Sequence, residues 1–280
     1  MAVVAVGARA PGTSYGAPVA RVDYSDRAGA YRSARTLPAA VLRSWDEAVR
    51  PIAAARAGAP GAGVVLDLGA GPGGFLDPLA EWFGGRVVAV EIADAMRAEA
   101  QRAGTADRFS YVAGRAEQIP LADASVDAAW LSTVVHQFDD LDAAAVELRR
   151  VVRPRGLVLV RGFFGDQSLT GLFELFPGIE RAAATFPTTD AVLGCFERAG
   201  FARRRVIDVV ERWTFELDAW TDRVRAIRHT DSALRPLTDA DFEAGVAAVH
   251  ASRGGQVDPV VSDTILRLLV LGEPADEAGR

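Results

Sequence analysis

The chain has 280 residues, half of them hydrophobic, and its 31 basic and 37 acidic side chains give a formal net charge of −6. This composition is sufficient for a sizeable core and excludes disorder throughout, while the negative balance offers no basic field for nucleic acid or an anionic membrane surface. Cys195 is the single cysteine and the three histidines are scattered, which excludes an intramolecular disulfide and a Cys/His zinc site, so we expect a cytoplasmic protein with a small-molecule partner and no metal.

The N-terminal part is expected to begin with a flexible tail over residues 1–20, followed by a single domain over residues 21–280. The opening apolar run is short and is interrupted by Arg9, which does not fit a secretory signal. No stretch reaches the roughly 20 apolar residues that cross a bilayer. A helix is predicted over residues 37–57, and the turn-rich segment 58–63 leads into the first strand.

Short apolar runs alternate with helix-periodic segments between about Val64 and Val160, which is the pattern of a parallel α/β sheet. The predicted strands are residues 64–68, 86–91, 109–112, 126–131 and 157–162, and the predicted helices are residues 74–83, 93–103 and 142–151. Asp142 is the expected N-cap of the last helix, which ends before Pro154. Right-handed crossovers then place helices on both faces of the sheet, as in a doubly wound fold.

The C-terminal third is less regular and contains no internal repeat. Helices are predicted over residues 189–199, 217–228 and 239–252. Strands are predicted over residues 204–210 and 265–271. We expect these elements to be appended to the central sheet.

The segment Gly69-Ala-Gly-Pro-Gly-Gly74 fits the pattern G-x-G-x-x-G, and Glu91 follows about 20 residues later at the end of the next strand. An NAD(P)-dependent oxidoreductase therefore has to be considered. Asp67 precedes the first glycine by two residues, and Pro72 removes one backbone N–H from the turn. Both details suit a cationic ligand better than a pyrophosphate, which needs free N–H groups at the helix start.

The segment from Leu66 to Gly73 resembles the first motif of class I S-adenosylmethionine-dependent methyltransferases. The resemblance implies a Rossmann-like sheet of seven strands, the last antiparallel, with the cofactor across the carboxyl ends of the strands and S-adenosylhomocysteine as the product. The glycine loop would pass beneath the methionine part of the cofactor. The residues that this motif assigns to cofactor binding are Asp67, Gly69, Ala70, Gly71 and Gly73.

Further segments resemble the same family in the same order. The segment 88–96 resembles the second-strand motif, in which Glu91 would receive the ribose hydroxyls, with Ile92 and Met96 beside the adenine. The segment 113–127 resembles the third signature, which implies that Ala116 and Glu117 border the adenine. Arg115 departs from the commoner form of that signature.

Two more segments complete the resemblance on the cofactor side. The stretch that begins at Leu131 resembles the exit of the fourth strand, so Leu131 is a further candidate for cofactor binding. Residues 24–35 resemble, more loosely, a segment that folds over the cofactor. There Tyr31 or Arg35 would contact the methionine carboxylate, because a guanidinium matches a carboxylate in charge and shape.

The acceptor is expected to lie under a lid formed by residues 21–57 and 165–255. His136 is the candidate catalytic residue, either orienting the acceptor or taking its proton, and the alternative is a histidine that only hydrogen-bonds a loop. Phe163 and Phe164 are the candidate acceptor contacts. The resemblance implies methyl transfer to N, O or C of a small molecule, by analogy in bacterial natural-product biosynthesis. A monomer or homodimer is expected, and a noncatalytic methyltransferase-like binding protein is the second alternative.

Overall fold

The computed structural model describes residues 28–56, 63–253 and 259–274. The expected tail over residues 1–20 and nearly all of the expected turn at 58–63 lie outside the described residues. The strands are β1 (Val64–Leu68), β2 (Arg86–Glu91), β3 (Ser110–Ala113), β4 (Val126–Ser132), β5 (Val152–Gly162), β6 (Ala202–Phe215) and β7 (Val260–Gly272).

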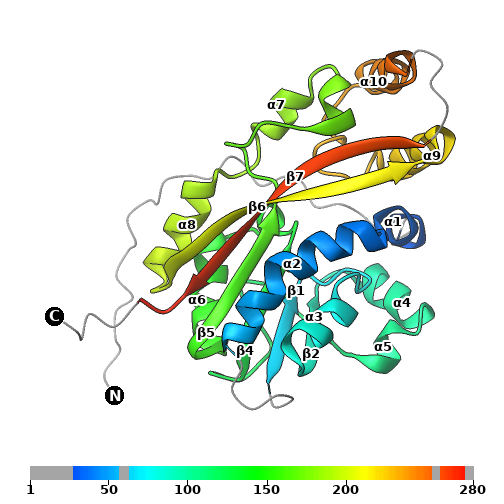
Figure 1. Ribbon diagram of the computed structural model, residues 1–280. Helices are drawn as coiled ribbons and strands as arrows, with labels where there is room; N and C mark the ends of the chain where they lie inside the picture. Colours follow the sequence, from blue (N-terminus) through cyan, green and yellow to red (C-terminus); the bar gives the residue numbers. More distant parts are fainter. Residues whose placement is uncertain (1–27, 57–62, 254–258, 275–280) are drawn as a thin grey trace, which may run out of the picture.

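Helices connect and flank these strands (Figure 1). The α-helices are α1 (Ala28–Arg35), α2 (Ala39–Arg56), α3 (Leu76–Phe83), α4 (Asp94–Arg102), α5 (Thr105–Arg108), α6 (Leu141–Val151), α7 (Ile179–Ala183), α8 (Thr189–Arg198), α9 (Leu217–Ile227) and α10 (Asp239–Ser252), and the 3-10 helices are η1 (Val135–Gln137) and η2 (Gly171–Leu175). Across residues 28–56, 63–253 and 259–274, no helix combines the length and the apolar character that a membrane span requires.

The seven strands form one sheet in the order β3-β2-β1-β4-β5-β7-β6. Strands β1 to β5 pair in parallel, and β7 pairs antiparallel with both β5 and β6. This confirms the predicted seven-stranded, mostly parallel sheet. The chain moves outward from β1 to β3 and returns to β4 on the other side of β1. The carboxyl ends of β1 and β4 therefore flank the switch point at which open α/β sheets bind ligands.

Each face of the sheet is covered by its own hydrophobic cluster. On one face Trp45 of α2 and Leu79 of α3 pack over the apolar residues of β1, β4 and β7. On the other face Leu148 of α6 and Phe196 of α8 pack over the alternate residues of the same strands. Burial on both faces explains why the central strands are apolar at nearly every position.

The end strands β6 and β7 are longer than the predicted segments 204–210 and 265–271. They pair along their whole length, from Ala202↔Gly272 to Phe215↔Val260, and extend past the rest of the sheet toward α9 (Figure 1). Helices α7, α9 and α10, which we call the cap, contribute most of a third hydrophobic cluster, with Phe176 and Trp220 at its centre. The cap thus has a core of its own.

Three predicted boundaries were wrong for local reasons. Asp140, not Asp142, is the N-cap of α6, and its side chain accepts a hydrogen bond from the backbone N–H of Ala143 at 2.9 Å. Helix α3 starts at Leu76, two residues later than predicted, because Phe75, with φ −111° and ψ 0°, is its N-cap and lies outside the helical region. Strand β5 starts before Pro154 because the register against β4 shifts there, which leaves the proline outside the regular ladder.

Candidate functional site

The glycine loop leaves β1 at its carboxyl end and requires glycine at two positions. Gly69 has φ +73°, and a Cβ there would lie 2.5 Å from Val134; Gly73 has φ +94°, and a Cβ there would lie 2.5 Å from the hydroxyl of Tyr111. Gly71 also has positive φ, but within the described part of the chain a Cβ at Gly71 would meet no atom within 4 Å. The loop is therefore tightly packed beneath Gly69 and Gly73 and open at Gly71.

Glu91 ties the end of β2 to this loop. Its carboxylate is buried and accepts hydrogen bonds from the backbone N–H of Gly71 at 2.8 Å and from that of Ala93 at 2.7 Å. Burial raises the pKa of Glu91, although those two N–H groups oppose the rise. The carboxylate and the open side of the glycine loop lie together, as the spacing of the two motifs predicts.

Asp67 brings a second carboxylate to the same place. Its side chain is only 3% exposed, and no hydrogen-bond or ion-pair partner for it occurs among the described residues. Burial and the charge of Glu91 raise the pKa of Asp67 to about 8. Arg97 donates to the backbone carbonyl of Glu91 at 2.7 Å and its charge lowers the pKa of the Glu91 carboxylate, but it is not paired with Asp67. Two buried carboxylates side by side disfavour a pyrophosphate and favour a cationic ligand.

The candidate adenine-binding residues differ in how far their side chains are exposed. Ile92 is 47% exposed directly after β2, so its apolar side chain is available to a flat ring. Met96, Ala116 and Leu131 are buried. The Glu117 carboxylate accepts hydrogen bonds from Arg115 Nε and from the backbone N–H of Asp139, both at 2.9 Å. Arg115, which departs from the family pattern, thus holds Glu117 in place.

A family model described as a methyltransferase domain matches residues 66–160. The chain is 35% identical over 133 residues to a malonyl-[acyl-carrier protein] O-methyltransferase of Serratia marcescens, covering 47% of this chain and 51% of the relative. It is 33% identical over 129 residues to the ubiquinone/menaquinone biosynthesis C-methyltransferase UbiE of Shewanella frigidimarina, covering 44% and 50%. The chain therefore spans about half the length of these relatives.

This chain is therefore similar to methyltransferase domains over residues 66–160. Its fold is also that of solved structures that share little sequence with it. A protein of Anabaena variabilis described as a methyltransferase of an antibiotic biosynthesis pathway has a TM-score of 0.58 and 20% identity, over 84% of this chain and 98% of that one. The [4+2]-cyclase SpnF has a TM-score of 0.52 and 18% identity, over 82% and 81%. A fold shared with a cyclase does not by itself define the reaction.

Helix α1 carries the two candidate residues Tyr31 and Arg35, and Arg35 is held by the cap. The Arg35 guanidinium donates to the Asp231 carboxylate at 2.5 Å and lies 5.5 Å from the ring of Tyr31. Asp231 also accepts the backbone N–H groups of Ala233 and Leu234. Arg35 is thus engaged by the loop between α9 and α10, and the expected contact with a methionine carboxylate would have to compete with this ion pair.

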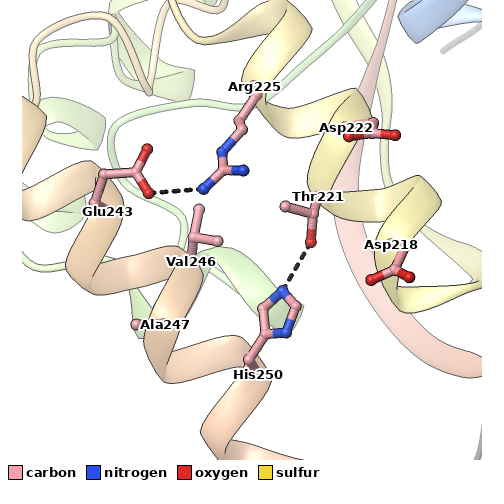
Figure 2. Close-up of a pocket in the computed structure, with 8 residues that line it drawn as sticks. All are labelled: Asp218, Thr221, Asp222, Arg225, Glu243, Val246, Ala247 and His250. Atoms are coloured by element: carbon pink, nitrogen blue, oxygen red, sulfur yellow. Dashed lines mark hydrogen bonds and ion pairs between the residues drawn. The ribbon is translucent and has the colours of Figure 1, made fainter.

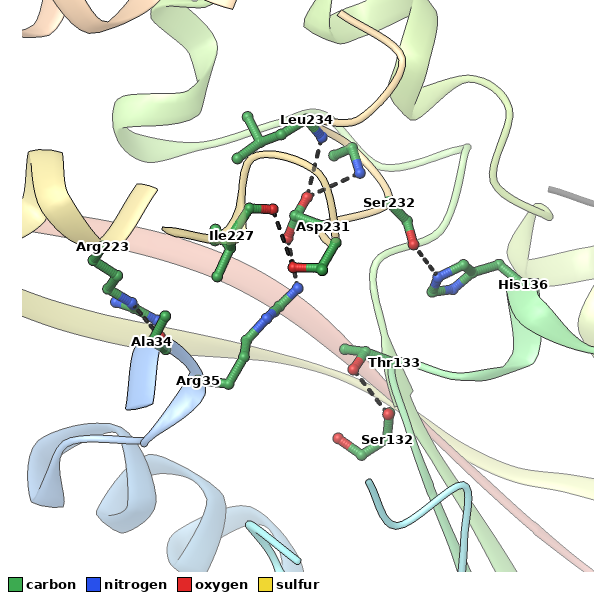
Figure 3. A network of polar contacts seen from close by, with 12 residues as sticks. Ala34, Arg35, Ser132, Thr133, His136, Arg223, Ile227, Asp231, Ser232 and Leu234 are labelled. Atoms are coloured by element: carbon green, nitrogen blue, oxygen red, sulfur yellow. Dashed lines mark hydrogen bonds and ion pairs between the residues drawn. The ribbon is translucent and has the colours of Figure 1, made fainter. Parts of the chain in front are cut away.

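His136 lies in η1, just beyond the carboxyl end of β4. Its Nε2 is 2.9 Å from the hydroxyl oxygen of Ser232, and its ring lies 4.7 Å from that of Phe186. Burial, opposed by the charge of Asp231 and reinforced by the charges of Arg35 and Arg235, lowers the pKa of His136 to about 4. The imidazole is therefore neutral at physiological pH and is held by the cap loop that carries Asp231 and Ser232 (Figure 3).

The two candidate phenylalanines have different environments. Phe163 is partly exposed and meets the ring of Phe186 at 5.7 Å, edge to face, on the His136 side of the site. Phe164 is completely buried and packs in the cluster beneath α6 and α8. Phe163 can contact an acceptor without rearrangement, whereas the ring of Phe164 serves the core.

A buried polar cluster that the sequence did not predict lies under this site. Arg161, at the end of β5, donates to the Ser132 hydroxyl at 3.0 Å and pairs with Glu211 of β6. Glu211 also accepts the indole N–H groups of Trp45 at 2.6 Å and Trp213 at 3.2 Å. An arginine in the otherwise apolar predicted segment 157–162 was the available signal for Arg161. The positions of Arg223, Asp231 and Ser232 carried no such signal.

The cap also has an outward-facing groove of about 570 Å³ between α9 and α10 (Figure 2). Thr221 and His250 are joined across it by a contact of 2.9 Å, and Arg225 pairs with Glu243 at 2.8 Å. All its lining residues belong to these two helices and none to the strand ends. Among the described residues, no group of His, Cys, Asp and Glu is arranged to hold a metal ion.

Proposed function

We propose that the protein is an S-adenosylmethionine-dependent methyltransferase that acts on a small molecule. The observation that carries this proposal is that the open glycine loop, the Glu91 carboxylate and the Asp67 carboxylate, which is buried and has no partner among the described residues, lie together. The cationic ammonium and sulfonium groups of the cofactor suit these two carboxylates. Glu91 would release its backbone partners for the ribose hydroxyls, and Ile92 would cover the adenine.

When bound, S-adenosylmethionine would supply a methyl group activated by its sulfonium. An electron pair of the acceptor, on N, on O or on a carbanion or π-bonded C, would displace that methyl group, the electrons of the methyl–sulfur bond would stay on the then neutral sulfur of S-adenosylhomocysteine, and a proton on the attacking atom would pass to solvent. The sulfonium already activates the methyl group, so the protein mainly aligns the acceptor and excludes water. Neutral His136 would accept a hydrogen bond from the acceptor. Phe163 would contact the acceptor's apolar part.

The proposal also divides the chain between the cofactor and the acceptor. Residues 60–162 would hold the cofactor, and residues 21–57 and 165–255 would form the acceptor side of a single domain. The binding partner would be a small molecule rather than nucleic acid or a membrane, in the cytoplasm of a cell, with a monomer or homodimer as the working unit.

Titration calorimetry with S-adenosylhomocysteine and with NADPH tests the proposal against an oxidoreductase. We expect S-adenosylhomocysteine to bind wild-type protein and NADPH not to bind. Glu91→Ala should weaken S-adenosylhomocysteine binding at least about tenfold, because it removes two charge-assisted acceptors, and Gly71→Arg should obstruct the open side of the loop. Asp94→Ala, at an exposed carboxylate three residues after Glu91, is the control. Unchanged affinity in both loop variants would refute the site.

The noncatalytic alternative is distinguished by turnover. A methyltransferase should transfer the radiolabelled methyl group of S-adenosylmethionine to a component of a small-molecule extract, and the product should carry one additional methyl by mass. Tight cofactor binding without any transfer across extracts and candidate acceptors would favour a binding protein.

A further inference from the structure

Arg223 projects from α9 toward the carboxyl end of α1. Its guanidinium carbon lies 4.0 Å from the ring centroid of Trp213 and 5.4 Å from that of Phe215, and its Nε donates to the carbonyl of Ala34 at 2.5 Å. In the described part of the chain, its two terminal amino groups meet no acceptor. The stacked rings fix the plane of the guanidinium, so these amino groups form the fork that matches a carboxylate.

The carboxylates nearest to Arg223 are already used. Asp231 is paired with Arg35, and Glu211 is paired with Arg161. Burial and the charge of Arg35, against the opposing charges of Glu211 and Asp231, together lower the pKa of Arg223 to about 10. The charges within the Arg35–Asp231 and Arg161–Glu211 pairs therefore cancel, whereas the charge of Arg223 has no such partner among the described residues.

Arg223 belongs to the His136 side of the site rather than to the glycine loop. The charges of Arg35 and Asp231 act on both Arg223 and His136. At the glycine loop, the arginine whose charge acts on Tyr111 is Arg32. Figure 3 shows Arg223 beside Ala34, with Arg35 and Asp231 between it and His136.

We propose that Arg223 binds a carboxylate of the methyl acceptor, so that the acceptors of this protein are organic acids. This inference rests on the proposed methyl transfer. A carboxylate between the free amino groups of Arg223 would neutralise the remaining charge. The rest of the acceptor would then extend toward the rings of Phe163 and Phe186 and toward His136.

The test uses benzoate as the probe and benzamide as its uncharged counterpart of the same shape. Each is titrated by NMR into the full chain saturated with S-adenosylhomocysteine at neutral pH. We expect benzoate to bind wild-type protein at least about tenfold more tightly than benzamide. R223Q should abolish that preference. R225Q, two residues along the same helix at the exposed pair with Glu243, should keep it.

The proposal would be overturned if wild-type protein showed no preference for benzoate, or bound neither probe. It would also be overturned if the preference persisted in R223Q. A preference that persists together with weaker S-adenosylhomocysteine binding in R223Q would assign the carboxylate partner of Arg223 to the cofactor. If R223Q does not fold, R223K, which keeps the charge and loses the fork, should reduce the preference several-fold, and an unchanged preference counts against the proposal. Failure of the proposed function is separate, because wild-type protein would then not bind S-adenosylhomocysteine at all.

Discussion

Asp67 and Glu91 end neighbouring parallel strands, and each is buried at the place where a cofactor would lie. Removing a carboxylate from water is costly unless it finds a partner or takes up a proton. Glu91 has backbone partners, whereas the raised pKa of Asp67 favours its protonated, uncharged form. A cation bound at this place would therefore displace the proton of Asp67.

The exchange predicts a measurable proton release. With a pKa of about 8, Asp67 is mostly protonated at pH 7, and a cationic ligand beside it lowers that pKa, so the proton leaves as S-adenosylmethionine binds. Calorimetry at pH 7 in buffers of different ionisation enthalpy should show release approaching one proton per cofactor. Asp67→Asn should abolish the release, and a binding enthalpy that is independent of buffer in the wild type would contradict the assignment.

His136 is expected to act as a neutral hydrogen-bond acceptor. Because its pKa is lowered to about 4, its protonation state does not change across the neutral range, and activity should show no step from this residue near the usual histidine pKa of about 6.5. Below about pH 4 the imidazole gains a proton and loses its acceptor nitrogen, so activity should fall there. His136→Ala should lower turnover about tenfold or more with unchanged S-adenosylhomocysteine affinity. Wild-type turnover in His136→Ala would make His136 a structural residue.

At the scale of elements, α1 is held between α4 and the cap. Arg32 approaches Glu99 of α4 at 3.9 Å, and Arg35 pairs with Asp231 beyond α9. Arg223 donates to the carbonyl of Ala34 in the last turn of α1, where a cation complements the helix dipole. These contacts join α1 to both sides of the site.

Asp231→Ala should therefore loosen two elements at once. It removes the partner of Arg35 and the acceptor for two backbone N–H groups, which should cost about 1–3 kcal/mol. Hydrogen exchange should rise in residues 28–35 and 229–237, while β1 to β5 stay protected. Asp218→Ala, at an exposed carboxylate on α9, is the control and should change neither segment. Unchanged exchange in α1 would mean that Arg35 does not hold this helix.

Sequence patterns predicted the central elements well because burial on both faces and glycine geometry leave few alternatives. The bounds of β1, β2 and α10 agree with the prediction, and Glu91 meets the glycine loop as expected. The cap side was less predictable. Arg223 contacts Ala34, 189 residues earlier in the chain, and Ser232 contacts His136, 96 residues earlier. No local sequence pattern encodes such contacts.

For the molecule as a whole, Glu211 connects the layers. It receives hydrogen bonds from Trp45 of α2, Arg161 of β5 and Trp213 of its own strand. Glu211→Ala would leave the buried Arg161 charge and two indole N–H groups without this acceptor. We expect a loss of about 3–5 kcal/mol in the free energy of unfolding, measured by urea denaturation.

Glu243→Ala, which breaks the exposed pair with Arg225, is the matched control and should cost at most about 1 kcal/mol. Equal losses in the two variants would show that the buried cluster contributes no more than a surface ion pair. A double variant, Glu211→Leu with Arg161→Met, should recover part of the loss because it removes both buried charges together.

The long antiparallel pair of β6 and β7 makes the segment between these strands replaceable as a unit. The segment between β6 and β7, which contains α9 and α10, leaves the sheet at Phe215 and returns at Val260. Exchanging the 44 residues between those two points for the corresponding segment of a relative would replace Arg223, Asp231 and Ser232 together while the glycine loop, Asp67 and Glu91 stay untouched. A library of such grafts would sample new acceptor preferences on one unchanged cofactor platform.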